Sequence, residues 1–404
     1  MPKCNKTLIT NSNQNSVLKR FYNYIKIGSK PGKIPELDGL RALAIIMVLY
    51  FHFATFYREH HGSYFNHLFS DLIQRIMFNG WLGVDLFFVL SGYLIFHHLN
   101  SSQEHKPSPS RYALKRVLRT FPLYYAMLLL VALKLTPYHH TTAGFLDYVI
   151  HLAFLQDYIG TTVLVPLWSL ATEEKFYLLA PFLLLFLKRI SHKKGLLILV
   201  TVILLLNATK AILIYQSENI TNYITFFTQF RAPFHFAITS ILMGVIVALL
   251  CQRRQYQIRT FWLKSSLLNA YWLIFSILLI IVITCFTNLY QTTDWQWVNL
   301  MHLIMVTCFG LIVWHVTTHS GITYLKCLTG RFLRIVSVLS YALYLTHYAV
   351  LPWTYRLHIA YIFSEEAWVH ASTFALIYIG LTVIFSLILH YIVEKPFLIL
   401  KARL

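Results

Sequence analysis

The chain has 404 residues, of which 57% are hydrophobic and only 12% are charged, a composition that excludes an ordinary soluble domain and indicates a polytopic membrane protein. The net charge of +19 does not indicate nucleic-acid binding, because the basic residues form short clusters between apolar runs, as expected for signals of membrane topology. The five cysteines are scattered without a C-x-x-C pair, which argues against a disulfide framework and against a zinc site.

Residues 1–33 contain several lysines but no sustained apolar run. They are predicted to form a basic cytoplasmic tail and not a cleaved signal peptide. Residues 34–398 are predicted to form one all-α membrane domain, and residues 399–404 a short cytoplasmic tail. No appended soluble domain is expected.

Ten apolar runs are long enough to cross a bilayer, which takes about 20 residues of helix. Every second connection between them is rich in lysine and arginine, and this alternation predicts ten spans with both chain ends in the cytoplasm. The predicted spans are 37–57, 80–99, 119–136, 168–188, 195–215, 232–250, 268–288, 297–316, 334–353 and 373–393.

The first predicted span holds two ionisable groups that are costly inside a membrane, Arg41 and His52. They are eleven residues apart, so they project within about 20° of each other and lie roughly 16 Å apart along the helix axis. An alternative is that Arg41 only pairs with Asp38 at i−3 or reaches the membrane surface, while His52 is a hydrogen-bonded core histidine.

Four further ionisable residues are predicted to share the outer third of the membrane with His52: Asp85, Glu173, Glu174 and His347. Such groups are expected to face an interior cavity and to pair with one another. A carboxylate that orients an imidazole makes a general base, so one of the two glutamates is predicted to partner His52. Adjacent helix positions point about 100° apart, so only one of them can do so well.

The entry to the third span carries Lys115, Arg116 and Arg119 on the predicted cytoplasmic side. Arginine forks bind phosphate oxygens in pairs, so this cluster suits a polyphosphate ligand. The alternative is an ordinary positive anchor at the membrane surface.

Other features are given no chemical role. Ser91 lies outside any G-x-S-x-G elbow and is expected to be a small residue at a helix crossing. Three histidine pairs lack metal-ligand spacing, so no metal is expected at them. These pairs are His60–His61, His97–His98 and His139–His140.

Taken in order, six motifs resemble the family-3 integral membrane acyltransferases, bacterial enzymes that O-acylate cell-surface glycans. Together they span about residues 34 to 398, nearly the whole chain. The sequence has "ATEEK" where the family more often has a Ser-Val-Glu-Glu-Gln-like run, but both acids are retained. The motifs are "LDGLRALAIIMVLYFHF", "GVDLFFVLSGYLIF", "KRVLRTFPLYY", "LWSLATEEKFYLLAP", "SYALYLTHYAV" and "VEKPF".

The resemblance implies that an acyl group, usually acetyl, passes from cytoplasmic acyl-CoA to a hydroxyl of an extracytoplasmic glycan, such as lipopolysaccharide O-antigen, exopolysaccharide or a lipid-linked sugar. It implies a bacterial inner-membrane protein of the stand-alone form, with acyl-CoA as substrate, no bound cofactor and membrane lipids around it. The oligomeric state does not follow from the sequence.

The resemblance also implies roles for residues. Arg41 and His52 match the family's essential pair, with Arg41 toward the donor and His52 toward the acceptor. Arg116 and Arg119 match its R-x-x-R, and Glu173 or Glu174 matches its fourth-helix acid. The family pattern favours Glu174 as the partner of His52.

Two other classes of protein fit parts of the sequence. A transporter or flippase would also line a cavity with polar groups, but inverted repeats and paired broken helices are absent from the sequence. A non-catalytic scaffold gives no reason for ionisable groups within the spans.

Overall fold

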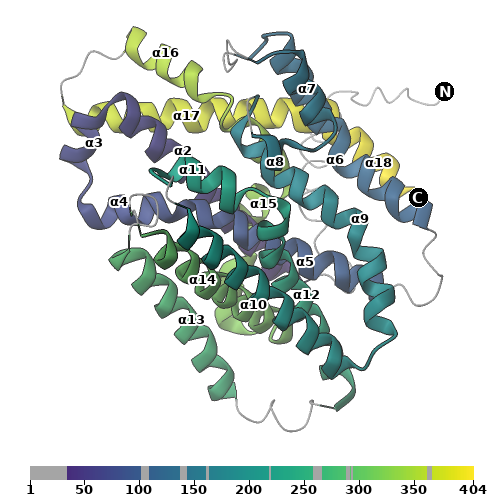
Figure 1. Ribbon diagram of the computed structural model, residues 1–404. Helices are drawn as coiled ribbons and strands as arrows, with labels where there is room; N and C mark the ends of the chain where they lie inside the picture. Colours follow the sequence, from purple (N-terminus) through teal and green to yellow (C-terminus); the bar gives the residue numbers. More distant parts are fainter. Residues whose placement is uncertain are drawn as a thin grey trace, which may run out of the picture.

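The computed structural model describes residues 34–101, 109–136, 143–160, 163–217, 220–257, 266–287, 292, 294–361 and 366–404. These residues form a helical bundle with no β-strand among them (Figure 1), which confirms the predicted all-α membrane fold. The predicted basic tail at 1–33 and the pair His139–His140 lie outside the described residues.

Ten long helices occupy the positions of the ten predicted spans. Helices α10, α12, α13 and α14 lie side by side in the lower part of Figure 1, and α17 runs across the top. The bounds are α2 Pro35–His60, α5 Gly83–Ser101, α6 Pro109–Ala132, α9 Trp168–Lys188, α10 His192–Gln216, α12 Phe234–Gln257, α13 Ser266–Phe286, α14 Trp295–Thr318, α15 Arg331–Thr346 and α17 Ala367–Leu389.

Shorter helices connect the long ones or extend them. Two of them, η3 and η5, are π-helical turns at the start of α12 and the end of α17. The short elements are α3 Gly62–Leu68, α4 Asp71–Phe78, η1 Asn79–Leu82, α7 Phe145–Leu152, α8 Gln156–Ile159, η2 Val165–Leu167, α11 Tyr223–Phe226, η3 Phe227–Arg231, η4 Thr323–Thr329, α16 Leu351–Tyr361, η5 His390–Glu394 and α18 Lys395–Ala402.

Six helices of the described chain are long and apolar enough to cross a membrane, and a seventh qualifies if the bent pair η4 and α15 is one span. The count of ten spans and the cytoplasmic placement of both ends stay predictions. Helices α6 and α9 fall outside the six; α6 carries four cations that line the cavities described below, and α9 carries Glu173, which lines one of them.

The outer surface of α9 is apolar, as a lipid-facing helix requires. Leu178, Phe182 and Leu185 follow one another at helical spacing, and their side chains are 73%, 69% and 57% exposed. A continuous apolar stripe of this kind marks a membrane contact and not a water-facing surface.

The centre of the bundle is the crossing of α5 with α12. A methyl group placed on Gly92 would lie 2.0 Å from the carbonyl oxygen of Ile241, and one on Gly244 would lie 2.0 Å from that of Val89. No side chain fits at either position, so the two backbones touch. Helix α2 packs against both α5 and α15 beside this crossing.

Helix α2 begins where its sequence predicts. Pro35 occupies the first turn, where its missing N–H costs nothing, and the buried carboxylate of Glu36 lies near the positive end of the helix dipole. Glu36 accepts hydrogen bonds from the Ser320 hydroxyl at 2.9 Å and the Gly321 amide at 2.8 Å. The carboxylate thereby anchors the helix to the turn before η4.

Candidate active site

A basic cavity of about 460 Å³ lies at the end of the molecule where α2 begins. Among its described lining residues Asp38 is the only acid. The structure brings together Arg41 and the cluster at the start of α6, as the sequence predicted, and adds two cations that the sequence interpretation missed, Arg111 and Lys401. The lining lysines and arginines are Arg41, Arg111, Lys115, Arg116, Arg119 and Lys401.

Contacts with aromatic and acidic groups position these cations. The guanidinium of Arg116 lies over the rings of Tyr112 and Tyr177, at 5.5 and 5.0 Å from their centroids. Arg41 donates to the carboxylate of Asp38 at 3.4 Å, the i−3 contact that the sequence offered as an alternative. Both guanidinium groups still line the cavity.

Lys401 reaches this cavity from the far end of the chain. It lies on α18, which packs against α6 (Figure 1). Residues 399–402, predicted as part of a tail, therefore belong to this helix. The sequence offered no periodic signal that would place a residue so near the end of the chain beside the first helix.

A smaller cavity of about 80 Å³ shares Arg41, Arg119 and Tyr177 with the basic cavity and adds Glu173. The hydroxyl of Ser91 donates to one oxygen of Glu173 at 2.5 Å, and the hydroxyl of Tyr177 donates to the other at 3.1 Å. The charges of Arg41 and Arg119 act on the same carboxylate. Glu173 is thus held by two hydroxyl groups at the edge of a cavity that Arg41 and Arg119 also line.

The prediction for Ser91 was therefore wrong in detail. The small residue at the α5–α12 crossing is its neighbour Gly92, and Ser91 instead lines both cavities. A one-residue step along the helix turns the side chain by about 100°, from the crossing into the cavity.

The predicted pairing of His52 with Glu174 is not formed. Glu174 is under the influence of Thr120 and Arg116 on α6, while Glu173 lines the smaller cavity together with Arg41. Both acids therefore lie at the depth of the arginines and not of His52.

The depth estimate failed because α9 begins inside the bundle. Pro166, Leu167 and Trp168 precede or open the helix, and all three are buried. Counting residues from the start of the helix therefore placed the two acids too close to the outer surface.

His52 has another histidine beside it. Its ring centroid lies 5.1 Å from that of His347 and 4.9 Å from that of Tyr348. The Nδ1–H of His347 donates to the carbonyl of Leu343 at 3.1 Å, so the lone pair of the neutral ring is on Nε2. This Nε2 is buried and has no hydrogen-bond partner in the described structure. The prediction that His347 shares a layer with His52 is confirmed.

Asp85 does not pair with the residues predicted to share its layer; its partners are others. Its carboxylate accepts hydrogen bonds from Arg231 at 2.6 Å, Ser240 at 2.7 Å and His302 at 2.9 Å, and all four side chains are buried. The guanidinium of Arg231 also lies 4.8 Å from the centroid of Trp81. This network ties α5 to η3, α12 and α14.

Sequence reasoning missed Arg231, although a signal for it existed. The charge alternation requires the connection before α12 to be poor in lysine and arginine, and Arg231 stands at its end. A cation that breaks the alternation needs a buried acid as partner, and Asp85 was available.

Tyr344 connects the smaller cavity to the histidine pair. Its hydroxyl lies 2.5 Å from the Ser169 hydroxyl and 2.9 Å from the Pro166 carbonyl, and both Tyr344 and Ser169 line that cavity. The ring of Tyr344 is 5.6 Å from the ring of His347. Polar side chains therefore follow one another from the basic cavity to His52.

The departure from the family motif at Lys175 has a local explanation. The Lys175 ammonium forms an ion pair with the buried carboxylate of Asp157 on α8, outside both cavities. The ion pair joins α9 to α8 and does not involve the neighbouring glutamates, Glu173 and Glu174.

Comparison with known proteins agrees with the motifs. Residues 34–391 match the family described as an acyltransferase domain. The peptidoglycan O-acetyltransferase OatA of Listeria monocytogenes is 29% identical over 339 residues, 80% of this chain and 50% of its own length. The O-acetyltransferase OatA of Staphylococcus aureus strain NCTC 8325 is 25% identical over 344 residues, 80% of this chain and 51% of its own.

The chain thus spans about half the length of these curated relatives. No solved structure matches it. The family match covers nearly all of the bundle and both parts of the candidate site. The chain therefore belongs to the family-3 membrane acyltransferases, the family that its motifs resemble.

Proposed function

We propose that this protein is an integral membrane O-acetyltransferase. It takes an acyl group, usually acetyl, from acyl-CoA and transfers it to a hydroxyl of a surface glycan. The observation that carries the proposal is the continuity of the site: a cavity lined by six lysines and arginines adjoins a smaller one lined by Glu173 and Tyr344, and the ring of Tyr344 lies 5.6 Å from that of His347.

The basic cavity suits the donor. Coenzyme A carries phosphate groups, and guanidinium forks bind phosphate oxygens with paired hydrogen bonds. Arg116 and Arg119, together with Lys115, are assigned to these phosphates. Arg41 lies where the basic cavity meets the smaller one and is assigned to guiding the thioester arm toward Glu173.

The histidine pair suits the acceptor. His52 accepts the proton of the glycan hydroxyl as its oxygen attacks the thioester carbonyl. A C–O bond forms, the C–S bond breaks, and the proton passes to the departing CoA sulfur. His347 takes the orienting role that the sequence assigned to a glutamate, because its ring is 5.1 Å from the His52 ring and its Nε2 is free to accept a hydrogen bond. Transfer through an acyl-histidine would use the same pair.

The relatives favour a cell-wall glycan as acceptor, because one of them is named as a peptidoglycan O-acetyltransferase. We assign the basic cavity to the cytoplasmic side of a bacterial inner membrane and the histidine pair to the side of the glycan, in line with the charge alternation. Lipopolysaccharide O-antigen and exopolysaccharide are the other acceptors to test.

The test uses purified protein in sealed proteoliposomes with radiolabelled acetyl-CoA on one side of the membrane and each candidate glycan on the other. The expected result is release of free CoA together with labelled, base-labile acetyl ester on one glycan. The His52→Ala variant should lose both, whereas His60→Ala, an exposed histidine on the same helix, should keep both.

Label that crosses the membrane without thioester cleavage would overturn the proposal and indicate a transporter or flippase. Near wild-type transfer by a folded His52→Ala protein would instead overturn the role given to the histidine. Acyl ester on lipopolysaccharide or exopolysaccharide but not on peptidoglycan would correct the acceptor.

A further inference from the structure

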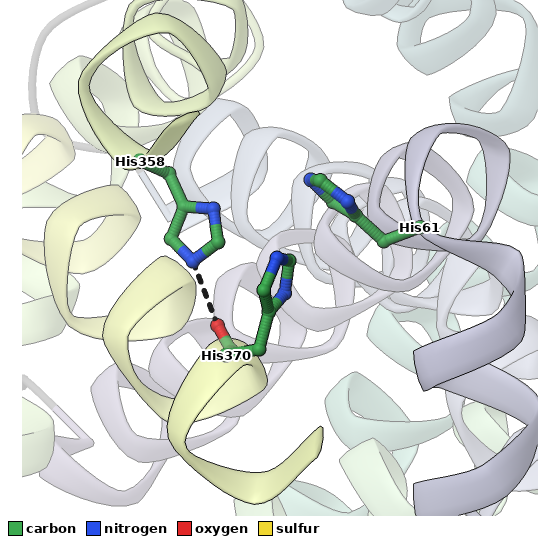
Figure 2. Close-up of side chains that lie close together, drawn as sticks. All are labelled: His61, His358 and His370. Atoms are coloured by element: carbon green, nitrogen blue, oxygen red, sulfur yellow. Dashed lines mark hydrogen bonds between the residues drawn. The ribbon is translucent and has the colours of Figure 1, made fainter. Parts of the chain in front are cut away.

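Three histidines meet at the end of α2 that lies opposite the basic cavity. His61 follows the last turn of α2, His358 lies on α16 and His370 lies in the first turns of α17. One ring nitrogen from each lies within 4.8 Å of the others. Figure 2 shows the three rings facing a common space, although they come from three separate segments.

The hydrogen bond of His358 leaves it one free ligand atom. Its Nε2–H donates to the carbonyl of His370 at 3.0 Å, shown as the dashed line in Figure 2. The lone pair of the neutral ring is therefore on Nδ1, which is buried without a hydrogen-bond partner in the described structure. A buried, unpaired acceptor is unfavourable unless something else binds it.

The other two rings each bring one nitrogen to the same place. The Nε2 of His61 is likewise buried without a partner among the described residues. The Nδ1 of His370 lies 2.9 Å from the hydroxyl of Tyr57, and the ring stacks on Tyr64 at 4.3 Å. A bond from this Nδ1–H to the tyrosine oxygen leaves the second nitrogen of His370 unprotonated. Metal-binding histidines are commonly held in this way, by a second hydrogen bond on the far side of the ring.

We propose that His61, His358 and His370 bind a divalent transition-metal ion, with Zn²⁺ as the preferred ion. Three imidazoles suit zinc, copper or nickel, whereas Mg²⁺ and Ca²⁺ require oxygen ligands. Zinc–nitrogen bonds of about 2.0–2.1 Å place tetrahedral ligands roughly 3.4 Å apart, so side-chain rotation must draw the rings together. Three protein ligands leave the fourth position for water.

The proposed site is separate from the acyl-transfer site. His61 lies nine residues after His52, which corresponds to about 14 Å along the axis of α2. Its role is to hold the α16–α17 pair against the end of the helix that carries His52. Without the ion, described contacts between these segments are largely aromatic, such as Tyr57 and His61 against Phe374.

The test is zinc binding by purified full-length protein without a polyhistidine tag, after chelator treatment. Titration with ZnCl₂ should show one tight site per chain and a rise in the unfolding temperature. With Co²⁺ in its place, the protein should show the visible absorption of tetrahedral cobalt. X-ray absorption should give nitrogen ligands at about 2.0–2.1 Å.

The His358→Gln and His370→Gln variants should each lose this site, and the matched control His60→Gln should keep it. His60 is exposed, adjoins His61 and already bonds the carbonyl of Phe56. His61→Cys, which supplies a thiolate ligand, should retain zinc and show that the fold is intact. Equal zinc binding by His358→Gln and wild type, or no binding by wild type, would overturn the proposal.

Discussion

Asp85 and Glu173 are both carboxylates inside a membrane bundle, yet the structure gives them opposite surroundings. Asp85 is fully buried and receives bonds from Arg231, Ser240 and His302, so little acceptor capacity remains for a substrate. Glu173 is bound only by hydroxyl groups in the described contacts, and it borders a cavity beside two arginines. A buried carboxylate whose oxygens are all bound by protein groups stabilises the fold, whereas one that borders a cavity can also interact with a substrate. Burial alone does not distinguish the two.

The largest effect, on the stability of the fold, is expected from removing the carboxylate of Asp85. Asp85→Ala leaves the buried guanidinium of Arg231 without its partner, which typically costs about 3–5 kcal/mol. We expect loss of a monodisperse, folded protein, measured by gel filtration and thermal unfolding in detergent. Asp71→Ala, an exposed acid on α4, is the matched control and should be neutral. If the Asp85→Ala protein is stable and has lost only its transfer activity, Asp85 acts in acyl transfer and not in holding the fold together.

The next effect concerns the histidine pair, with the fold unchanged. His52→Ala removes a general base and should slow transfer by about 10²–10⁴-fold. His347→Ala should cause a similar loss, because the two rings are adjacent. Groups that act as a unit are non-additive, so the double variant should be little slower than either single one. Single losses that multiply would mean that the two histidines act independently.

Glu173→Gln should keep the fold and lower transfer by about 10²-fold, because an amide preserves the shape but removes the charge that faces Arg41 and Arg119. Glu59→Gln, an exposed acid on α2, is the matched control. The measurement is the transfer rate together with the unfolding temperature. If Glu173→Gln unfolds while Asp85→Ala does not, the comparison between the two acids is reversed.

The smallest effect is expected at the donor cavity. Arg116→Gln should weaken acyl-CoA binding by roughly tenfold to a hundredfold, since bonds to charged groups contribute about 1.5–3 kcal/mol each. Arg116→Lys should be milder, because it keeps the charge and loses the fork. Binding is measured by calorimetry, and the control is Lys193→Gln, a change of an exposed lysine on α10. Unchanged affinity with altered membrane insertion would make Arg116 a topological anchor.

Apolar run length and charge alternation predicted the positions of the ten long helices and the meeting of Arg41 with Arg116 and Arg119. These features are local, or follow from helix periodicity. The partners of Asp85 were not predictable in the same way, because they come from three other elements. The depth of Glu173 was misjudged because burial of the chain before α9 is a tertiary property.

The histidine cluster shows the same limit. Of its members only His61 was considered from the sequence, within the pair His60–His61, where no metal was expected; His358 and His370 lie in distant segments. The ligand geometry arises only when the end of α2 packs against α16 and α17.

The close backbone contacts of Gly92 with Ile241 and of Gly244 with Val89 have a mechanical consequence. Backbones in direct contact have no side chains between them to repack, so α12 rigidly supports α5, which lines one side of the donor cavity. The opposite wall is α6, which packs mainly against α18 and η5 near the end of the chain. Room for a bulky donor must therefore come from movement of α6 and α18, which carry Arg116 and Lys401, while Ser91 and its glutamate stay in place.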